Sequence, residues 1–142
     1  MDVIKTKIAI VGAGPAGATL ALLLAKKKIP HLLIEKESFP RDKICGDGYT
    51  AEVFRVLREI DESLYHEFID APWTEPSYGS YVELADRTYI NTDFKSEMNK
   101  GAMYYVAKRK KFDDWLISKI DKNYTETHFQ SKVETITKTP LG

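Results

Sequence analysis

The chain has 142 residues, which is enough for one domain with a real hydrophobic core but short for a two-domain oxidoreductase. Its 21 basic and 21 acidic residues balance, which excludes the strong positive field typical of nucleic-acid-binding proteins. A single cysteine excludes an internal disulfide and a cysteine cluster for a metal ion.

The N-terminal segment has no cationic stretch followed by an apolar core and a cleavage site, so no secretory leader is predicted. No apolar run approaches the roughly 18 residues that a membrane-spanning helix needs. We therefore expect a soluble, cytoplasmic protein.

Residues 7–35 form the segment around which the chain is organised, KIAIVGAGPAGATLALLLAKKKIPHLLIE. An apolar run at residues 8–11 predicts a strand, and the leucine-rich segment after the glycines predicts a mostly buried helix. A second apolar run at residues 31–34 predicts another strand, which ends at an acidic residue. This order of elements is the context that a G-x-G-x-x-G dinucleotide-binding motif requires.

Each residue of the glycine turn has a physical role in such a motif. Gly12 permits the tight turn after the first strand, Gly14 leaves room for a pyrophosphate at the backbone, and Gly17 allows close packing of helix on sheet. Pro15 and Ala16 lie where the helix begins, so its free N–H groups and positive dipole end would face the phosphates.

Glu35 follows the second strand, 23 positions after Gly12. A carboxylate at that position accepts hydrogen bonds from ribose hydroxyls. It would repel a 2′-phosphate, so NADP is disfavoured at this site. The segment as a whole predicts binding of an adenine dinucleotide.

The loop at residues 36–50 contains a proline and two glycines, which break regular structure. It leaves the carboxyl edge of the second strand, where ligands of open α/β sheets bind. Its cationic side chains Arg41 and Lys43 are suited to pair with phosphate, and residues 45–48 would bring backbone N–H groups close to a flat ring.

The glycine turn, Glu35, Lys36 and the segment PRDKICGDG at residues 40–48 resemble the N-terminal part of the geranylgeranyl reductase family of FAD-dependent oxidoreductases. That family belongs to the group related to p-hydroxybenzoate hydroxylase, which also contains flavin monooxygenases and halogenases. The Arg-x-Lys-x-Cys-Gly loop is the discriminating feature. The resemblance implies FAD as cofactor and a Rossmann-like FAD/NAD(P)-binding α/β fold, with a parallel sheet, helices and the start of an antiparallel β-layer.

The resemblance also implies cofactor contacts. In the family the glutamate binds the adenosine ribose, and the arginine and Cys-Gly segment lie along the FAD, so these roles fall to Glu35, Arg41, Cys45 and Gly46, with Lys36 beside them. Cys45 has two interpretations: a small buried apolar residue, or a thiol made acidic and reactive by neighbouring cations, with a redox or catalytic role.

The middle of the chain changes character along its length. Residues 51–69 predict two short amphipathic helices that separate near an acidic pair. Two prolines in residues 71–79 predict a turn or linker. Residues 80–84 and 88–92 predict a hairpin, and residues 102–107 a third strand. In the resembling family this region begins the sheet on the substrate side of the flavin.

The C-terminal part begins with an amphipathic helix from Arg109 to about residue 120. In the resembling family an arginine at the head of such a helix, followed by Phe-Asp and then Leu, lies by the FAD, and Arg109, Phe112, Asp113 and Leu116 match that pattern. A guanidinium there pairs with phosphate or sugar oxygens, and a solvated basic cluster is the alternative. Strands are predicted at residues 124–129, joining the dinucleotide sheet in parallel, and at residues 132–137. The resemblance implies that Val133 lies near the adenine.

These elements divide the chain into a dinucleotide-binding core with its following helices (residues 1–71), a β-rich segment of the substrate-side layer (72–107) and a return to the FAD-binding domain (108–142). The resemblance covers only the N-terminal portion of a family member, so we expect a truncated chain. Its uncovered sheet edges and apolar faces would favour self-association.

The function predicted first is that of the N-terminal FAD-binding part of an oxidoreductase that reduces double bonds of a prenyl chain or similar lipid. NAD(P)H is the candidate electron donor, and a lipid substrate implies peripheral attachment to a membrane. The alternatives are a flavin monooxygenase or halogenase and a non-catalytic dinucleotide-binding module. A simple NAD dehydrogenase would leave the loop at residues 40–48 unexplained. No catalytic residue and no metal ligand are predicted.

Overall fold

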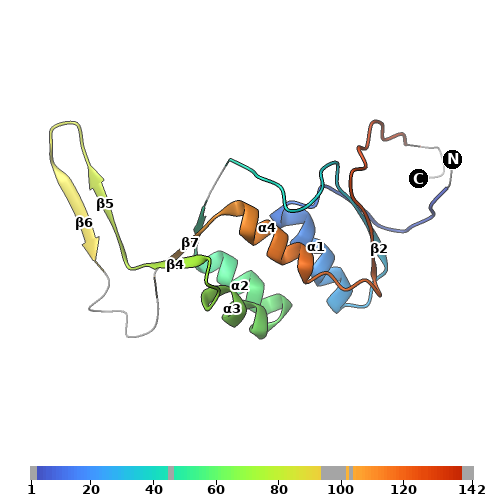
Figure 1. Cartoon of the computed structure of the whole chain (residues 1–142), viewed down its shortest axis with the longest axis horizontal. Helices are drawn as coiled ribbons and strands as arrows, with labels where there is room; N and C mark the ends of the chain where they lie inside the picture. The colour runs from blue at the N-terminus through green and yellow to red at the C-terminus, as the bar shows by residue number, and fades with distance from the viewer. Residues whose placement is uncertain (1–2, 45–46, 94–101, 103, 139–142) are drawn as a thin grey trace. The chain divides into compact units, whose positions relative to one another are not determined.

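The computed structural model describes residues 3–44, 47–93, 102 and 104–138. The chain forms two compact units (Figure 1). Unit 1 comprises residues 1–43 and 110–142, and unit 2 comprises residues 44–109.

Unit 1 contains a three-stranded parallel sheet with the order β1-β2-β8. The strands are β1 (Ala9–Val11), β2 (His31–Ile34) and β8 (Thr125–His128), and helix α1 (Pro15–Lys26) connects the first two. The order is that of half a doubly wound dinucleotide-binding sheet. The predicted α/β class with a strand–helix–strand core is confirmed, and so is the parallel strand at residues 124–129.

The core of unit 1 lies between this sheet and its helices. One cluster of buried residues in this core consists of Ile10, Ala13, Ala21 and Leu33. Helix α4 (Arg109–Ser118) and the residues after it add apolar side chains at the periphery, namely Ile117 and Ile120. Two of the four buried residues are alanines, so the helix and strand backbones approach closely.

A buried histidine joins two strands of the same sheet. The Nδ1 atom of His31 lies 2.9 Å from the carbonyl oxygen of Ile29, and Nε2 lies 3.0 Å from the hydroxyl of Thr125. A carbonyl only accepts, so Nδ1 donates and Nε2 accepts from the threonine. Both ring nitrogens are satisfied inside the fold, which assigns His31 a structural role.

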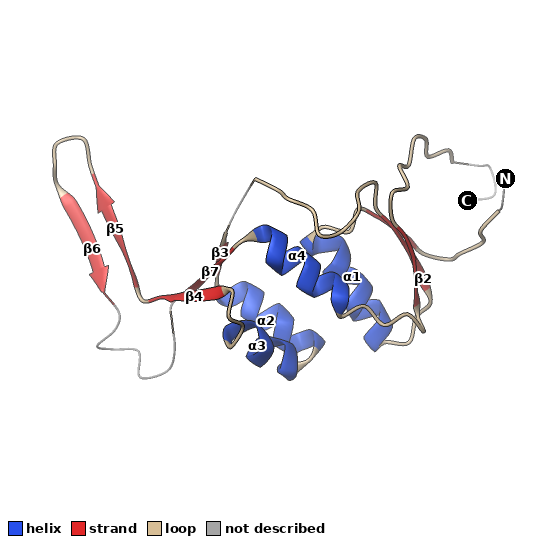
Figure 2. Ribbon diagram, in the orientation of Figure 1, coloured by secondary structure: helices blue, strands red, loops and turns tan. Residues whose placement is uncertain are grey.

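Unit 2 is built on a three-stranded antiparallel sheet with the order β3-β7-β4. These strands are β3 (Gly48–Tyr49), β7 (Tyr104–Ala107) and β4 (Thr74–Ser77). Helices α2 (Ala51–Ile60) and α3 (Glu62–Ile69) lie side by side beside it (Figure 2). The predicted separation of the two helices is confirmed: Asp61 is extended between them and caps α3 by accepting the Ser63 N–H at 2.8 Å.

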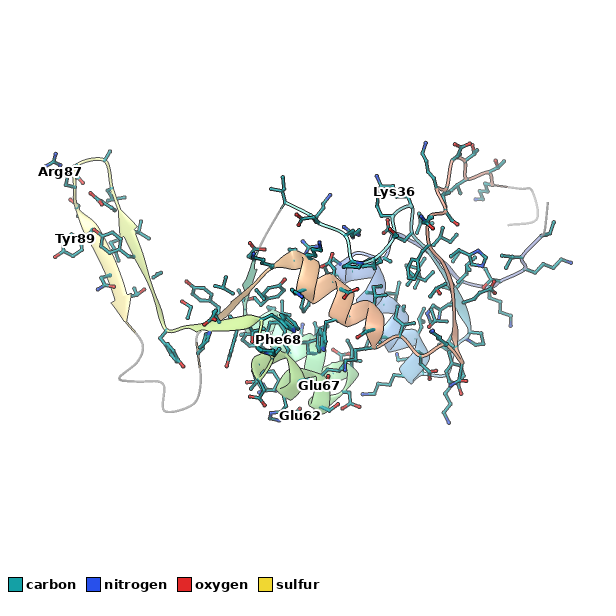
Figure 3. All side chains as sticks on the ribbon, viewed as in Figure 1. Lys36, Glu62, Glu67, Phe68, Arg87 and Tyr89 are labelled. Atoms are coloured by element: carbon teal, nitrogen blue, oxygen red, sulfur yellow. The ribbon has the colours of Figure 1, made fainter. Side chains whose placement is uncertain are left out.

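Aromatic rings form the core of unit 2. Phe68 is fully buried and contacts Tyr49, Trp73 and Tyr105, with ring centroids 5.2, 5.8 and 6.0 Å away. Figure 3 labels Phe68 in this cluster, whereas Glu62 of the same helix is exposed. These edge-on contacts hold α3 against the antiparallel sheet.

The predicted hairpin is present as β5 (Gly79–Glu83) and β6 (Tyr89–Asp93), which pair antiparallel. Its turn is closed by a hydrogen bond from the Leu84 N–H to the Thr88 carbonyl, 2.7 Å long. Large apolar and aromatic side chains on the hairpin are exposed: Tyr81, Val82, Leu84, Tyr89 and Ile90.

Two predictions of local structure were wrong. The segment expected to be a linker contains strand β4, which includes Pro76. β4 lies at the edge of its sheet, and there a proline is tolerated because the outer N–H has no strand partner. The strand predicted at residues 132–137 is irregular, because no described strand pairs with this segment after the Ser131 N–H has bonded the Glu35 carbonyl at 2.9 Å.

The boundaries of the two compact units differ from the three parts expected from the sequence, because α2 and α3 pack with the antiparallel sheet. The assignment of those parts to FAD and substrate sides stays a prediction.

Candidate functional site

A cleft of about 400 Å³ opens at the carboxyl edge of the parallel sheet in unit 1. Its volume lies within the range of small-molecule sites. Three segments distant in the sequence line it: the glycine turn, the loop after β2 and the chain after β8. Predicted cofactor residues from all three are among its lining: Gly12, Gly14, Glu35, Lys36, Arg41 and Val133.

The glycine turn positions the N-terminus of α1 at this cleft. Gly12 has a positive φ of 97°, and its N–H donates to the Ile34 carbonyl at 2.7 Å. Gly14 is the extended residue before the helix and Pro15 is the first helical residue. Within the described residues no side chain caps this helix end. The first-turn N–H groups, which include those of Ala16 and Gly17, are therefore available to an anion.

Gly17 sets the distance between α1 and β1. A Cβ atom at this position would overlap the carbonyl oxygen of Gly12 and lie 3.3 Å from Cγ2 of Ile10. The obstruction is backbone, which cannot rotate away as a side chain can. Glycine is therefore required here by packing, whatever ligand the turn holds.

Glu35 connects the glycine turn to the loop after β2. Its side chain is buried, and Oε2 accepts the Ala13 N–H at 2.8 Å while Oε1 accepts the Glu37 N–H at 3.1 Å. Burial alone would raise the pKa of this carboxyl, but the backbone N–H donors and the Arg41 guanidinium outweigh burial and lower the pKa below its ordinary value. Glu35 is thus ionised at neutral pH, and each oxygen retains acceptor capacity.

Arg41 brings a cation to the same place. Its side chain is 15% exposed, and Nη2 lies 3.5 Å from Oδ2 of Asp113, a carboxylate on α4 that is fully buried. The guanidinium lies over the Phe39 ring, 5.3 Å from its centroid. A Cβ built on Gly14 would lie 3.2 Å from Nη2 of Arg41, so this cation stands directly beside the glycine turn.

Asp113 was not among the cofactor-binding residues predicted from the sequence, although it belongs to the helix pattern shared with the resembling family. The signal that identifies it is its place on α4, where its neighbours Phe112 and Leu116 are buried. A carboxylate on the apolar face of a helix needs a partner, and the sequence did not indicate that Arg41 supplies one.

The remaining predicted residues differ in how the structure places them. Lys36 is exposed at the cleft, 3.8 Å from the Glu37 carboxylate (Figure 3). Val133 is half-buried in the lining, and its place near an adenine stays a prediction. Cys45 and Gly46 lie outside the described residues, so their predicted roles are untested.

Arg109 begins α4 and belongs to unit 2. Its N–H donates to Oδ1 of Asp47 at 3.2 Å, within the same unit. Its predicted position beside FAD stays a prediction.

In the described ranges, no three or more His, Cys, Asp or Glu side chains gather in a way that could hold a metal ion. No helix in the described part of the chain has the length and apolar character needed to span a membrane.

Comparison with known proteins identifies the family. Residues 5–142 match the family model described as an FAD binding domain. The chain belongs to the FAD binding domain family. FAD as the cofactor of this domain is therefore confirmed, as is the Rossmann-like fold.

Sequence relatives of this FAD binding domain include halogenases and reductases. A flavin-dependent halogenase from Pestalotiopsis fici is 31% identical over 136 residues, 96% of this chain and 24% of that protein. A digeranylgeranylglycerophospholipid reductase from Methanosarcina acetivorans is 32% identical over 107 residues, 75% of this chain and 24% of that protein. The chain thus spans about a quarter of the length of these curated relatives.

A solved structure agrees with the resemblance found in the sequence. The geranylgeranyl bacteriochlorophyll reductase-like protein from Thermoplasma acidophilum superposes with a TM-score of 0.74 at 25% identity, covering 95% of this chain and 32% of that one. The resemblance to geranylgeranyl-reductase-like flavoproteins is confirmed. Family membership establishes a flavoprotein domain and does not by itself choose between reduction and halogenation.

The residues of the cleft fit the ADP part of FAD. Because Gly14 has no Cβ, Nη2 of Arg41 lies against the glycine turn, so the N–H donors of the helix end and of the guanidinium are close together, as a phosphate site requires. Glu35 is ionised at the edge where a ribose is expected. Arg41 also has a buried Nε that finds no hydrogen-bond partner among the described residues, so its donor capacity is not exhausted inside the protein.

We predict that Gly17→Ala lowers the free energy of unfolding by about 1–3 kcal/mol or more, because the new methyl group overlaps backbone. Urea unfolding measures the loss. Gly48→Ala is the matched control, since a Cβ there meets nothing within 4 Å, and it should change stability by less than about 1 kcal/mol. Equal losses in the two variants would contradict the packing argument.

We predict that Glu35→Gln costs about 1–3 kcal/mol of stability at pH 7, because the amide end that replaces one oxygen cannot accept an N–H. The folded-state pKa of Glu35 is lowered, so the wild-type advantage is present above its ordinary value of 4.5 and is lost as pH falls through the folded pKa. Urea unfolding between pH 7 and 3 measures this. Glu37→Gln is an exposed control, and its stability difference from wild type should not shrink as pH falls. A stability difference between wild type and Glu35→Gln that stays constant with pH would refute the buried, ionised state assigned to Glu35.

Proposed function

We propose that this chain is the FAD-binding part of a flavoenzyme that reduces isolated double bonds of a prenyl chain or similar lipid. The observation that carries the FAD site is the buried, ionised Glu35 bonded to the N–H of Ala13 in an uncapped glycine turn. A carboxylate in this position suits the two hydroxyls of an adenosine ribose.

Each part of the cleft has a role in this proposal. The helix N-terminus at Ala16 and Gly17 and the Arg41 guanidinium bind the pyrophosphate, because both offer N–H donors and positive charge. Glu35 binds the ribose, and Val133 offers an apolar surface to the adenine. FAD, when bound, supplies the hydride-transfer chemistry, while the protein supplies position and electrostatics.

Two observations favour reduction. The resemblance to geranylgeranyl reductases rests on the Arg-x-Lys-x-Cys-Gly loop at residues 41–46, and a digeranylgeranylglycerophospholipid reductase is among the relatives. A lipid substrate, NAD(P)H as electron donor and peripheral contact with a membrane belong to the same proposal. Halogenation is the second candidate, because the flavin-dependent halogenase matches 96% of the chain.

The two reactions differ in their requirements. A reductase should oxidise its electron donor without oxygen when a prenyl lipid is supplied, whereas a halogenase needs oxygen and a halide. Anaerobic turnover of the full-length protein with a prenyl lipid would support reduction. Turnover that depends on oxygen and on chloride or bromide would show halogenation in place of reduction. Tight FAD binding with neither activity would favour a non-catalytic dinucleotide-binding module.

We predict saturable FAD binding by this chain, followed by the change in flavin fluorescence. Glu35→Ala should weaken binding at least about tenfold, because it removes the ribose acceptor and leaves the Ala13 N–H without its partner. ADP should compete, and NAD serves as a comparison ligand. Glu59→Ala on α2, an exposed carboxylate of unit 2, is the control and should leave the affinity unchanged. An affinity insensitive to Glu35 would refute this site.

Self-association belongs to the proposal as well. The hairpin β5–β6 exposes Val82 and Ile90, which pair across the strands, and Tyr81 and Tyr89, which stack with centroids 5.8 Å apart. A two-stranded hairpin has too little surface to be stable alone, so a second copy that covers it is favoured.

We predict a molar mass that rises with concentration in static light scattering, and a smaller rise for the double variant Val82→Thr, Ile90→Thr, which keeps β-branched residues in both strands. The exposed change Glu62→Gln on α3 serves as the control. A constant monomer mass at high concentration would refute self-association.

A further inference from the structure

The Asp113 carboxylate is the most unusual charge in unit 1. It lies on α4 between Phe112 and Leu116, both buried, and its own side chain has no exposed surface. A carboxylate removed from water in this way is stable only with charged or hydrogen-bonding partners. Arg41, whose Nη2 lies 3.5 Å from Oδ2, supplies the positive charge.

This ion pair determines where the guanidinium lies. The Phe39 ring covers the Arg41 guanidinium at 5.3 Å, and Asp113 attracts one of its terminal nitrogens. The same nitrogen, Nη2, is the atom nearest to a Cβ built on Gly14. The contact that pairs Arg41 with α4 therefore also sets this cation at the head of α1.

A second carboxylate competes for the same cation. Arg41 lowers the pKa of Glu35 through its positive charge, although the Glu35 oxygens are held by backbone N–H groups. If Asp113 lost its charge, Arg41 would be drawn toward Glu35. The glycine turn would lose its cation, and Glu35 would lose acceptor capacity that the proposed ribose contact uses.

We infer that Asp113 is a positioning residue for FAD: through its ion pair it keeps the Arg41 guanidinium beside the glycine turn, at the pyrophosphate, and away from Glu35. The inference rests on the proposed function of the cleft. Asp113 itself does not touch the cofactor in this arrangement and acts only through Arg41.

A double-mutant cycle tests the inference. FAD affinity is measured for wild type, Asp113→Asn, Arg41→Gln and the double variant, with unfolding midpoints recorded for each. Asp113→Asn should weaken FAD binding about tenfold when Arg41 is present and less than about twofold when Arg41 is Gln. Asp114→Asn, on the exposed neighbour in α4, should have no effect. Equal losses in both backgrounds, or no loss, would overturn the inference, and so would a loss of affinity that only follows the loss of the unfolding midpoint.

A measurement on the protein without cofactor separates this inference from the proposed function. The Nε–H resonance of Arg41 in a ¹H–¹⁵N spectrum should shift in Asp113→Asn and stay unchanged in Asp114→Asn. An unchanged resonance in Asp113→Asn overturns the positioning role even if FAD binds. If wild type does not bind FAD but the Arg41 resonance shifts in Asp113→Asn, the proposed function is refuted and only the Arg41–Asp113 ion pair is supported.

A second variant tests the inference if Asp113→Asn does not fold. Arg41→Lys retains a cation opposite Asp113 but loses the planar donor fork. It should keep the wild-type unfolding midpoint and weaken FAD binding about tenfold. Wild-type affinity in this variant would overturn the inference.

Discussion

The cleft depends on one residue that holds three chain segments together. The Glu35 carboxylate accepts N–H groups from the glycine turn and from its own loop, at Ala13 and Glu37. Its backbone N–H bonds the His128 carbonyl, and its carbonyl accepts the Ser131 N–H, both at 2.9 Å. The glycine turn, the end of β2 and the end of β8 thus meet at Glu35. Without these bonds, the N–H of Ala13 would be a buried donor with no acceptor.

The charges around Glu35 follow from the same arrangement. Glu35 and Asp113 are both buried acids, and Arg41 is the cation that acts on both. The helix end adds a partial positive charge that belongs to the backbone and cannot be titrated. The cleft therefore offers an acceptor and donors at separate points, which suits a ligand that has hydroxyls at one end and phosphates at the other. FAD is such a ligand.

Much of the fold could be predicted because its signals are local. Apolar periodicity located both strands of the first strand–helix–strand unit, and the split between α2 and α3 followed from the acidic residues at 61 and 62. The errors arose where pairing with a neighbouring strand decides whether a segment forms a strand. Pro76 argued against a strand, but β4 is an edge strand, and residues 132–137 alternate like a strand without a neighbour to pair with. For the site, the motif identified Glu35 and the resemblance identified Arg41. The pairing of Arg41 with Asp113 joins a loop to a distant helix, and no local pattern encodes it.

The contact at Gly17 has a consequence for how the domain responds to a ligand. The Gly17 backbone lies against the Gly12 carbonyl there, and the Ile10 side chain of β1 lies 3.3 Å from the position that a Cβ would take. The start of α1 therefore has little room to move toward the glycine turn. Substitutions at this position that abolish cofactor binding would report a change in the spacing of the scaffold, since Gly17 has no side chain with which to recognise a ligand.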